Sequence, residues 1–222
     1  LPISIVKKND VRAAIKFQFR QLKTFIHKKY KKNPTQKHLI RFQSTELKIN
    51  YYQKLFDKVK KSGLYTICTP FDEESVDIIE KMKFDIIKVA SCSSKDWPLL
   101  EKISQTNLPI IISTGGLEIS NIDHLVSFFK HRNSHFALMH CVSLYPTPDK
   151  DFYLNQIDIL KKRYPDIDVG WSTHEDPNDI IPVSIAIAKG ATILERHIGK
   201  PTGKIKLNAY SSDKQQLDNW IK

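Results

Sequence analysis

The sequence predicts an α/β protein of the TIM type, a (β/α)8 barrel that lacks or replaces its first strand. Short apolar runs alternate with longer amphipathic segments, which is typical of parallel βα units. Each run is apolar almost throughout, as expected for strands buried on both faces. Polar residues gather at the C-terminal ends of the runs. In a barrel these ends meet at one mouth, whereas an open sheet concentrates them at a switch point.

The predicted strands, in chain order, cover residues 13–19, 64–69, 85–91, 109–114, 135–141, 166–172 and 192–197. Between them we predict helices at residues 45–63, 72–83, 97–106, 118–131, 154–164 and 180–190. For the first of these helices, Ser44 is the predicted N-cap and Gly63 the predicted C-terminal stop.

A complete barrel has eight strands and roughly 250 residues. Residues 3–6 have the composition of a short strand, but the stretch that follows is shorter than the ~10 residues of a parallel crossover. We therefore expect residues 1–222 to form a single barrel domain that is incomplete at its N-terminus.

The cysteine content and the hydropathy pattern indicate the compartment of the protein. The three cysteines, Cys68, Cys92 and Cys141, are odd in number and far apart, which favours free thiols in a reducing compartment. The sequence contains no run of about 18 apolar residues and no signal-peptide pattern at its start. We therefore expect a cytoplasmic protein that has no membrane partner.

The positive charge is concentrated in one segment. Residues 20–43 contain eight Lys or Arg and no Asp or Glu, so most of the net charge of +11 lies there. Phe25, Tyr30 and Phe42 are interleaved with these cations, as in a surface that binds single-stranded nucleic acid. We favour a solvated basic loop near an anionic substrate, and nucleic acid is the less favoured partner.

Histidines follow two neighbouring predicted strands. His174 and His197 are candidate ligands for a divalent metal ion, and Glu195 or Asp176 could add an oxygen ligand. His140 could complete a three-histidine site. The alternative is that each histidine is a hydrogen-bonded structural residue at the end of its strand.

Lysines lie inside two otherwise apolar strands. Burying the ammonium of Lys16 or Lys88 is costly unless an anion meets it, either a carboxylate of the protein or a substrate. Together with strand-end hydroxyls they form a donor set suited to phosphate and carboxylate oxygens. These hydroxyls belong to Thr69, Ser91, Ser113 and Ser172. A lysine Schiff base, as in an aldolase, is the alternative use of either lysine.

Several motifs, in the same order, resemble those of the sialic acid synthases, and they cover most of the chain from residue 13 to about residue 200. The motifs are IKFQ (15–18), CTPFDEESVD (68–77), IKVAS (87–91), WPLLEKI (97–103), PIIISTGG (109–116), LMHCVSLYPTP (138–148), VGWSTHE (169–175) and GATILERH (190–197). The tail, residues 204–221, resembles the segment that closes the barrel of this family, and by this resemblance we expect no C-terminal antifreeze-like domain in these 222 residues. Members condense phosphoenolpyruvate with an N-acyl hexosamine to form nine-carbon keto acids in surface-glycan biosynthesis.

The resemblance implies roles for individual residues. It assigns His174 and His197 to a divalent ion, Mn²⁺ or Mg²⁺, and it makes a homodimer the expected assembly. Phosphoenolpyruvate is assigned to Lys16, Lys88, Thr69, Ser91, Ser113 and Ser172. We predict Lys16, Lys88 and Glu195 as catalytic residues, and we add Gln18 and Ser143, at the ends of their strands, to the substrate-binding residues.

Two other functions remain open at this point. One is a class I aldolase that uses a lysine Schiff base and needs no metal. The other is a non-catalytic barrel remnant that serves as a binding or assembly subunit. The missing first strand motivates the second reading, as does Ser93, which stands where the family usually has an acid.

Overall fold

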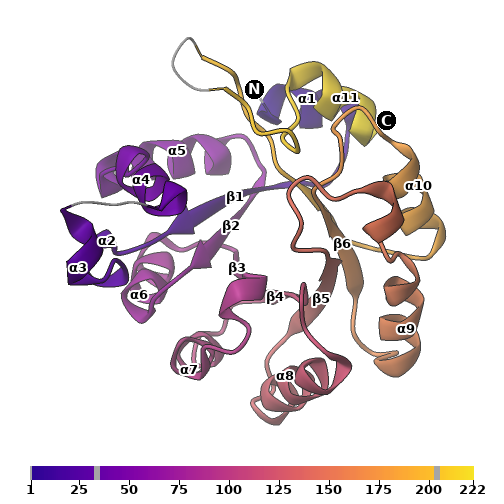
Figure 1. The fold of residues 1–222 in the computed structure, drawn as a ribbon, viewed down its shortest axis with the longest axis horizontal. Coiled ribbons are helices and arrows are strands. Elements are labelled where there is room, and N and C mark those ends of the chain that lie inside the picture. Colours follow the sequence, from indigo (N-terminus) through magenta and orange to yellow (C-terminus); the bar gives the residue numbers. More distant parts are fainter. Residues whose placement is uncertain (1, 33–35, 203–205) are drawn as a thin grey trace. The chain divides into compact units, whose positions relative to one another are not determined.

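The structure is a computed structural model that describes residues 2–32, 36–202 and 206–222 (Figure 1). The chain divides into two compact units. The first unit comprises residues 1–13, 89–94 and 109–222, and the second comprises residues 14–88 and 95–108. Parallel strands that alternate with helices build both units, in keeping with the predicted α/β class.

In the second unit, parallel strands pair in chain order. They are β1 (Ala14–Phe19), β2 (Tyr65–Pro70) and β3 (Ile86–Val89), the last residue of which belongs to the first unit. The helices are α2 (Leu22–Phe25), α3 (Lys28–Lys31), α4 (Lys37–Ser44), α5 (Ile49–Lys61), α6 (Glu73–Met82) and α7 (Trp97–Ser104).

Local sequence explains where α6 and α7 begin and end. The carboxylate of Asp72 accepts a hydrogen bond from the backbone N–H of Ser75 at 2.8 Å and thereby caps α6. This helix ends at Lys83, which has a left-handed φ of 61°. Asp96 caps α7 in the same way, and Pro98 stands in the first turn, where no N–H is needed.

The predicted N-cap of the helix at residues 45–63 is wrong. Ser44 is the last residue of α4, and its hydroxyl donates to the Arg41 carbonyl at 3.1 Å rather than to a helix start. The helix therefore begins later, at Ile49. The predicted stop is confirmed: Gly63 follows the C-terminal turn with a φ of +79°.

The basic segment, residues 20–43, includes residues 33–35, which lie outside the described part of the chain. Two of its aromatic side chains, Phe25 and Phe42, pack together, and Phe42 also contacts Arg20. The Arg20 guanidinium lies 4.4 Å from the ring centroid of Phe42 and 4.0 Å from that of Phe71. The Phe25 ring packs edge-on against the same two rings. These contacts give the start of the segment a fixed attachment to the end of β1.

In the first unit, four parallel strands again pair in chain order. They are β4 (Ile110–Ser113), β5 (Phe136–Cys141), β6 (Val169–Thr173) and β7 (Leu194–Arg196). The helices are α1 (Pro2–Asn9), α8 (Ile119–His131), α9 (Asn155–Arg163), α10 (Ile181–Ala188) and α11 (Lys214–Ile221), with 3₁₀ turns η1 (Ser91–Ser93) and η2 (Asp149–Asp151).

The two ends of the described chain meet in this unit, where α1 lies beside α11 (Figure 1). Asp218 of α11 accepts hydrogen bonds from Lys8 and from Asn9, both at 2.8 Å. Residues 3–6 belong to α1 and are helical, so they do not form the short strand that their composition suggested. Of the predicted closing segment, residues 204 and 205 lie outside the described part, and α11 forms its end.

A glycine allows β6 to approach its neighbours closely. A Cβ atom on Gly170 would lie 2.3 Å from the Ile193 carbonyl oxygen and 2.4 Å from the Met139 sulfur. The next residue, Trp171, is 2% exposed and fills the core on the other face of the strand. Gly170 thus permits the tight β6–β7 approach on which the site described below depends.

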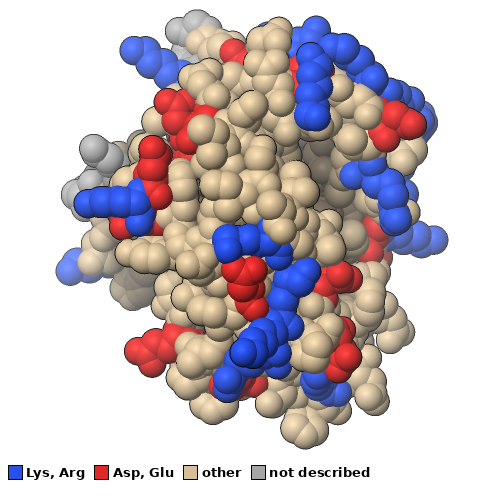
Figure 2. All heavy atoms as spheres, turned by 90° about the vertical axis from the view of Figure 1, so that its right-hand side faces the viewer, with Lys and Arg blue, Asp and Glu red and all other residues tan. Residues whose placement is uncertain are grey.

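Figure 2 shows the face of the molecule that carries α9 and α10, with both signs of charge interspersed. The Lys189–Asp158 ion pair, 2.6 Å, links these two helices. Four isoleucines at or near α10 are also exposed, namely Ile180, Ile181, Ile185 and Ile187. Within the described residues, the structure contains no helix of the length and hydropathy that a membrane span requires.

Candidate active site

The site in the first unit is built at the C-terminal ends of β6 and β7. Ser172 and Glu195 are register partners on these strands. The Ser172 hydroxyl donates a hydrogen bond to the Glu195 carboxylate at 2.9 Å. Because side chains alternate between the faces of a strand, His174 and His197, each two residues further on, fall on the same face as this pair.

His174 and His197 are close together, with ring centroids 5.3 Å apart. His174 is 6% exposed, and its Nδ1 lies 3.1 Å from the Val142 carbonyl oxygen. A carbonyl only accepts, so Nδ1 carries the proton in this hydrogen bond and the lone pair lies on Nε2. This orientation by a backbone carbonyl is the arrangement that metal-binding histidines commonly have.

Two tyrosines that the sequence analysis missed surround the histidines. The Tyr145 ring centroid lies 4.2 Å from that of His174, and the Tyr210 centroid lies 5.1 Å from that of His197. Burial raises the pKa of Tyr145, so its hydroxyl remains a hydrogen-bond donor at neutral pH. Tyr145 follows Ser143 after a predicted strand, a position that could have identified it. For Tyr210 the sequence offers no local signal.

Other candidate ligands lie elsewhere. The Asp176 carboxylate accepts hydrogen bonds from the backbone and side-chain amides of Asn178, at 2.9 and 3.0 Å. His140 bonds through Nε2 to the Phe152 carbonyl at 2.9 Å, and burial lowers its pKa. Within the described ranges, no cluster of three or more His, Cys, Asp or Glu side chains is placed to hold a metal. The three-histidine alternative is therefore wrong for this part of the chain.

A second group surrounds Gly115, after β4. The Gly115 N–H donates to the Ser91 hydroxyl at 3.0 Å, and the Ser91 oxygen lies 3.1 Å from the Cys141 sulfur. A Cβ on Gly115 would lie 2.8 Å from the Ser143 oxygen. Ser91 and Ser143 are thus brought together. Ser113 is 5% exposed, just before this turn.

The second unit carries the remaining predicted residues at the ends of β1, β2 and β3. Gln18 and Thr69 are register partners, and the side-chain amide oxygen of Gln18, Oε1, accepts a hydrogen bond from the Arg20 guanidinium at 2.9 Å. Thr69 is 1% exposed, and its hydroxyl has no hydrogen-bond partner among the described residues. A buried hydroxyl without a partner is costly, which points to a water or ligand oxygen there.

Both predicted lysines lie in this unit. Lys88 is 2% exposed, although its side chain ends in a polar amine. Lys16 is half-buried on β1, near Cys68. Burial raises the pKa of the Cys68 thiol well above its usual value, although the Lys16 charge opposes the shift. Cys68 is therefore a packed neutral thiol rather than a nucleophile.

Comparison with known proteins identifies the family. The sequence profile of the NeuB family matches residues 5–219. The chain belongs to this family. The N-acetylneuraminate-9-phosphate synthase of Drosophila melanogaster is 33% identical over 68% of the chain and 41% of its own length. The N,N'-diacetyllegionaminic acid synthase of Campylobacter jejuni is 31% identical over 82% of the chain and 57% of its own length.

A solved structure is also similar to the chain. It is that of spore coat polysaccharide biosynthesis protein E from Chromobacterium violaceum, which is 43% identical, with a TM-score of 0.95 over 99% of the chain and 66% of that protein. This likeness confirms the predicted fold class. The chain spans about half the length of the curated relatives it matches.

Proposed function

We propose that the protein is a synthase that condenses phosphoenolpyruvate with an N-acyl hexosamine, giving a nonulosonic acid and inorganic phosphate in glycan biosynthesis. The observation that carries the proposal is the set of side chains at the ends of β6 and β7. There, the ring centroids of His174 and His197 are 5.3 Å apart, and the Ser172 hydroxyl bonds to the Glu195 carboxylate. The two relatives named for sialic-type acids support the same reaction class.

The residues fit a divalent cation held by two imidazoles. The Val142 carbonyl sets the tautomer of His174, and only two histidines take part, which leaves coordination positions for water and substrate oxygens. We propose Mn²⁺ or Mg²⁺ as the ion, held by His174 and His197. When bound, it would act as a Lewis acid on the aldehyde of the open-chain sugar.

The reaction proposed for this chain balances as follows. The C3 carbon of phosphoenolpyruvate forms a bond to the aldehyde carbon of the hexosamine, and the aldehyde oxygen takes a proton. Water adds to C2, the C2–O bond to phosphate breaks, and the C2 hydroxyl loses its proton to leave the keto acid. Of the two protons of this water, one replaces the proton taken by the aldehyde oxygen and the other leaves with the phosphate. Glu195, held by the Ser172 hydroxyl, is the proposed acceptor of the proton from this water. Tyr145, a neutral donor beside His174, is placed to hydrogen-bond a sugar oxygen.

Anion binding is the proposed task of the lysines and hydroxyls. Lys88 and Lys16 supply positive charge for phosphate and carboxylate oxygens, and the Thr69 hydroxyl, without a partner in the described chain, adds a donor. Ser91 already accepts a hydrogen bond from the Gly115 N–H, so its own proton is the donor it offers. Ser113, Ser143, Ser172 and Gln18 complete the proposed substrate-binding set.

The test is phosphate release from phosphoenolpyruvate by the purified protein with Mn²⁺ and N-acetylmannosamine, then with a panel of related N-acyl hexosamines. Mass spectrometry of the product must show the sum of sugar and pyruvate masses. We expect release that requires both sugar and metal and that stops with chelator. Activity that persists in chelator and is trapped by borohydride on a lysine would replace the proposal with a Schiff-base aldolase.

A further inference from the structure

The stretch that carries the two histidines also has a second face. At the end of β6 and just beyond it, Ser172 and His174 alternate with Thr173 and Glu175, and at the end of β7, Glu195 and His197 flank Arg196. Thr173 and Arg196 are register partners. Since successive side chains of a strand point to opposite faces, Arg196 lies on the face of β7 opposite Glu195, and its ion pair places Glu175 on that same face.

Glu175 and Arg196 form a buried ion pair. Their closest atoms, Nη1 and Oε1, are 3.6 Å apart, and each side chain is only 1% exposed. Both carboxylate oxygens and all three guanidinium nitrogens lack hydrogen-bond partners within the described part of the chain. Burial raises the pKa of Glu175 to about 7, and the charge of Arg196 opposes this shift. Each charge is thus compensated chiefly by the other.

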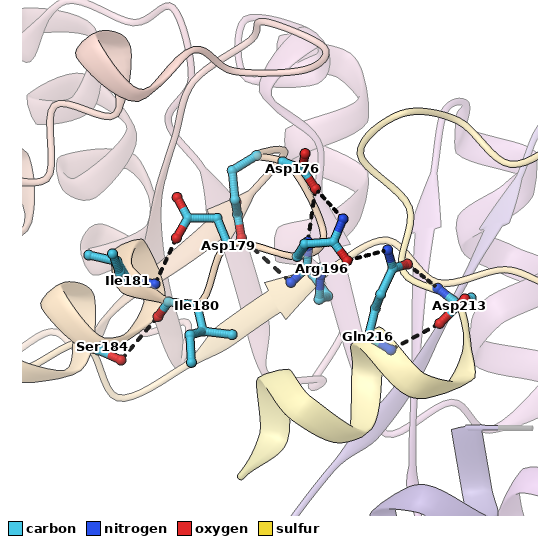
Figure 3. Close-up of polar contacts among 10 residues, drawn as sticks. Asp176, Asp179, Ile180, Ile181, Ser184, Arg196, Asp213 and Gln216 are labelled. Carbon is cyan, nitrogen blue, oxygen red and sulfur yellow. Dashed lines mark hydrogen bonds and ion pairs between the residues drawn. The ribbon is translucent and has the colours of Figure 1, made fainter.

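The same face is covered by α11. The Arg196 guanidinium lies 5.3 Å from the Trp220 ring centroid. At the start of α11, Asp213 and Gln216 form a reciprocal capping box, which Figure 3 draws together with Arg196. Just before the helix, the Ser212 N–H donates to the carbonyl of His197 at 2.9 Å. The segment formed by α11 and the residues just before it therefore contacts both the Arg196 side chain and the His197 backbone.

We propose that the Glu175–Arg196 pair is a positioning element that sets the separation and orientation of His174 and His197 for metal binding from the opposite face of β6 and β7. This inference rests on the proposed function, because it takes the two histidines as the metal ligands. Each member of the pair is the direct chain neighbour of one histidine, so moving either side chain moves the strand end that carries a ligand. Neither Glu175 nor Arg196 touches the metal or the substrate in this assignment.

The test measures Mn²⁺ affinity directly, by electron paramagnetic resonance of the unbound ion at pH 8, and so does not depend on turnover. Glu175→Gln and Arg196→Met each remove one charge. The double variant Glu175→Leu/Arg196→Met removes both and leaves no uncompensated charge behind. Leu160→Ala, which opens a cavity under α9 in the same unit at a residue 1% exposed, is the matched control for lost stability.

We expect both single variants to bind Mn²⁺ roughly 10-fold more weakly, in the range found when groups supporting a metal ligand are removed. The double variant should recover the melting temperature of the wild type but not its affinity for Mn²⁺, whereas Leu160→Ala should melt lower and bind Mn²⁺ normally. Wild-type affinity in the folded single variants, or recovery of affinity in the double variant, would overturn the proposal.

The wild-type protein separates this inference from the function on which it rests. Mn²⁺ binding without phosphate release from phosphoenolpyruvate would refute the proposed reaction, and the variant series would still decide the role of the pair. Absence of Mn²⁺ binding by the wild type would overturn the positioning role itself, together with the metal assignment of His174 and His197.

Discussion

Gly115 offers the sharpest test of how the serine hydroxyls are arranged. In Gly115→Ala, the new Cβ would lie 2.8 Å from the Cys141 sulfur, 2.8 Å from the Ser143 oxygen and 2.9 Å from the Ser91 oxygen. Each distance is shorter than any ordinary contact of a Cβ atom, so the three side chains must retreat by several tenths of an ångström. The hydrogen bond from the Gly115 N–H to Ser91, now 3.0 Å, must then lengthen or bend.

The size of the effect follows from these contacts. Inserting one methyl group into a packed site costs about 1–3 kcal/mol of unfolding free energy. If Ser91 holds an anionic oxygen, its displacement removes a hydrogen bond to a charged group, worth about 1.5–3 kcal/mol. This corresponds to a rise of roughly 10- to 100-fold in KM for phosphoenolpyruvate. KM for the sugar should change little.

The adjacent glycine provides the control. A Cβ on Gly116 would meet nothing within 4 Å, but Gly116 has a φ of +73°. Gly116→Ala should therefore cost about 1–2 kcal/mol of stability through backbone strain alone. Urea unfolding measures the stability of both variants, and phosphate release measures KM. A wild-type KM in Gly115→Ala, or an equal rise in KM in Gly116→Ala, would refute the assignment of Ser91 to phosphoenolpyruvate.

Three further predictions concern single side chains. Lys88→Met should raise KM for phosphoenolpyruvate about 10- to 100-fold, because a charge-assisted hydrogen bond is lost. Initial-rate kinetics measures KM for both substrates, and an equal rise in both would contradict the proposed role of Lys88. His174→Ala should abolish metal-dependent phosphate release. It should lower the unfolding free energy by only about 1 kcal/mol, the contribution of the hydrogen bond from His174 to the Val142 carbonyl. A collapse of the melting temperature would instead show that His174 is structural. The pKa of Asp85 is raised by burial but lowered more by its hydrogen bonds with Lys60 and Thr66, so the net shift is downward. A depressed carboxyl pKa stabilises the fold above the unfolded value of about 3.9, and this stability is lost as pH falls through the folded pKa. Asp85→Asn should therefore be less stable at pH 7 and show a smaller loss of stability in acid denaturation below about pH 4, whereas an unchanged acid transition would count against this linkage.

Much of the architecture was predictable because it depends on patterns that the sequence displays directly. Continuous apolar runs such as residues 109–114 and 135–141, short and followed by amphipathic segments, favour buried strands, and the structure places β4 and β5 within them. The start of α5 was mispredicted because Ser44 has two uses. Its hydroxyl can cap a following helix or bond back to the preceding one, and only the fold decides between them.

The site was predictable to the extent that it follows strand ends. Ser172 and Glu195 are adjacent because they are register partners on β6 and β7. Consecutive strands of a parallel barrel are neighbours, so the sequence implies this proximity. Tyr210 could not be found in this way. It reaches His197 from an irregular segment after β7, and no periodicity fixes where such a segment lies. The Cys141 contact with Ser91 was likewise hidden, because a short thiol in a strand reads as packing.

The sequence GWSTHE shows why one reading of a strand end is incomplete. Its alternate residues, Ser172 and His174, carry the polar pattern that suggests a site, and the pattern assigns no role to Thr173 or Glu175. Yet Glu175 is fully buried, and burying a carboxylate is unfavourable unless a cation meets it. Arg196 meets it from the strand that also presents His197. A replacement at either position would leave the other charge buried and uncompensated. The two faces of β6 and β7 therefore constrain each other. The geometry of the histidine pair thus depends on an interaction that no substrate touches.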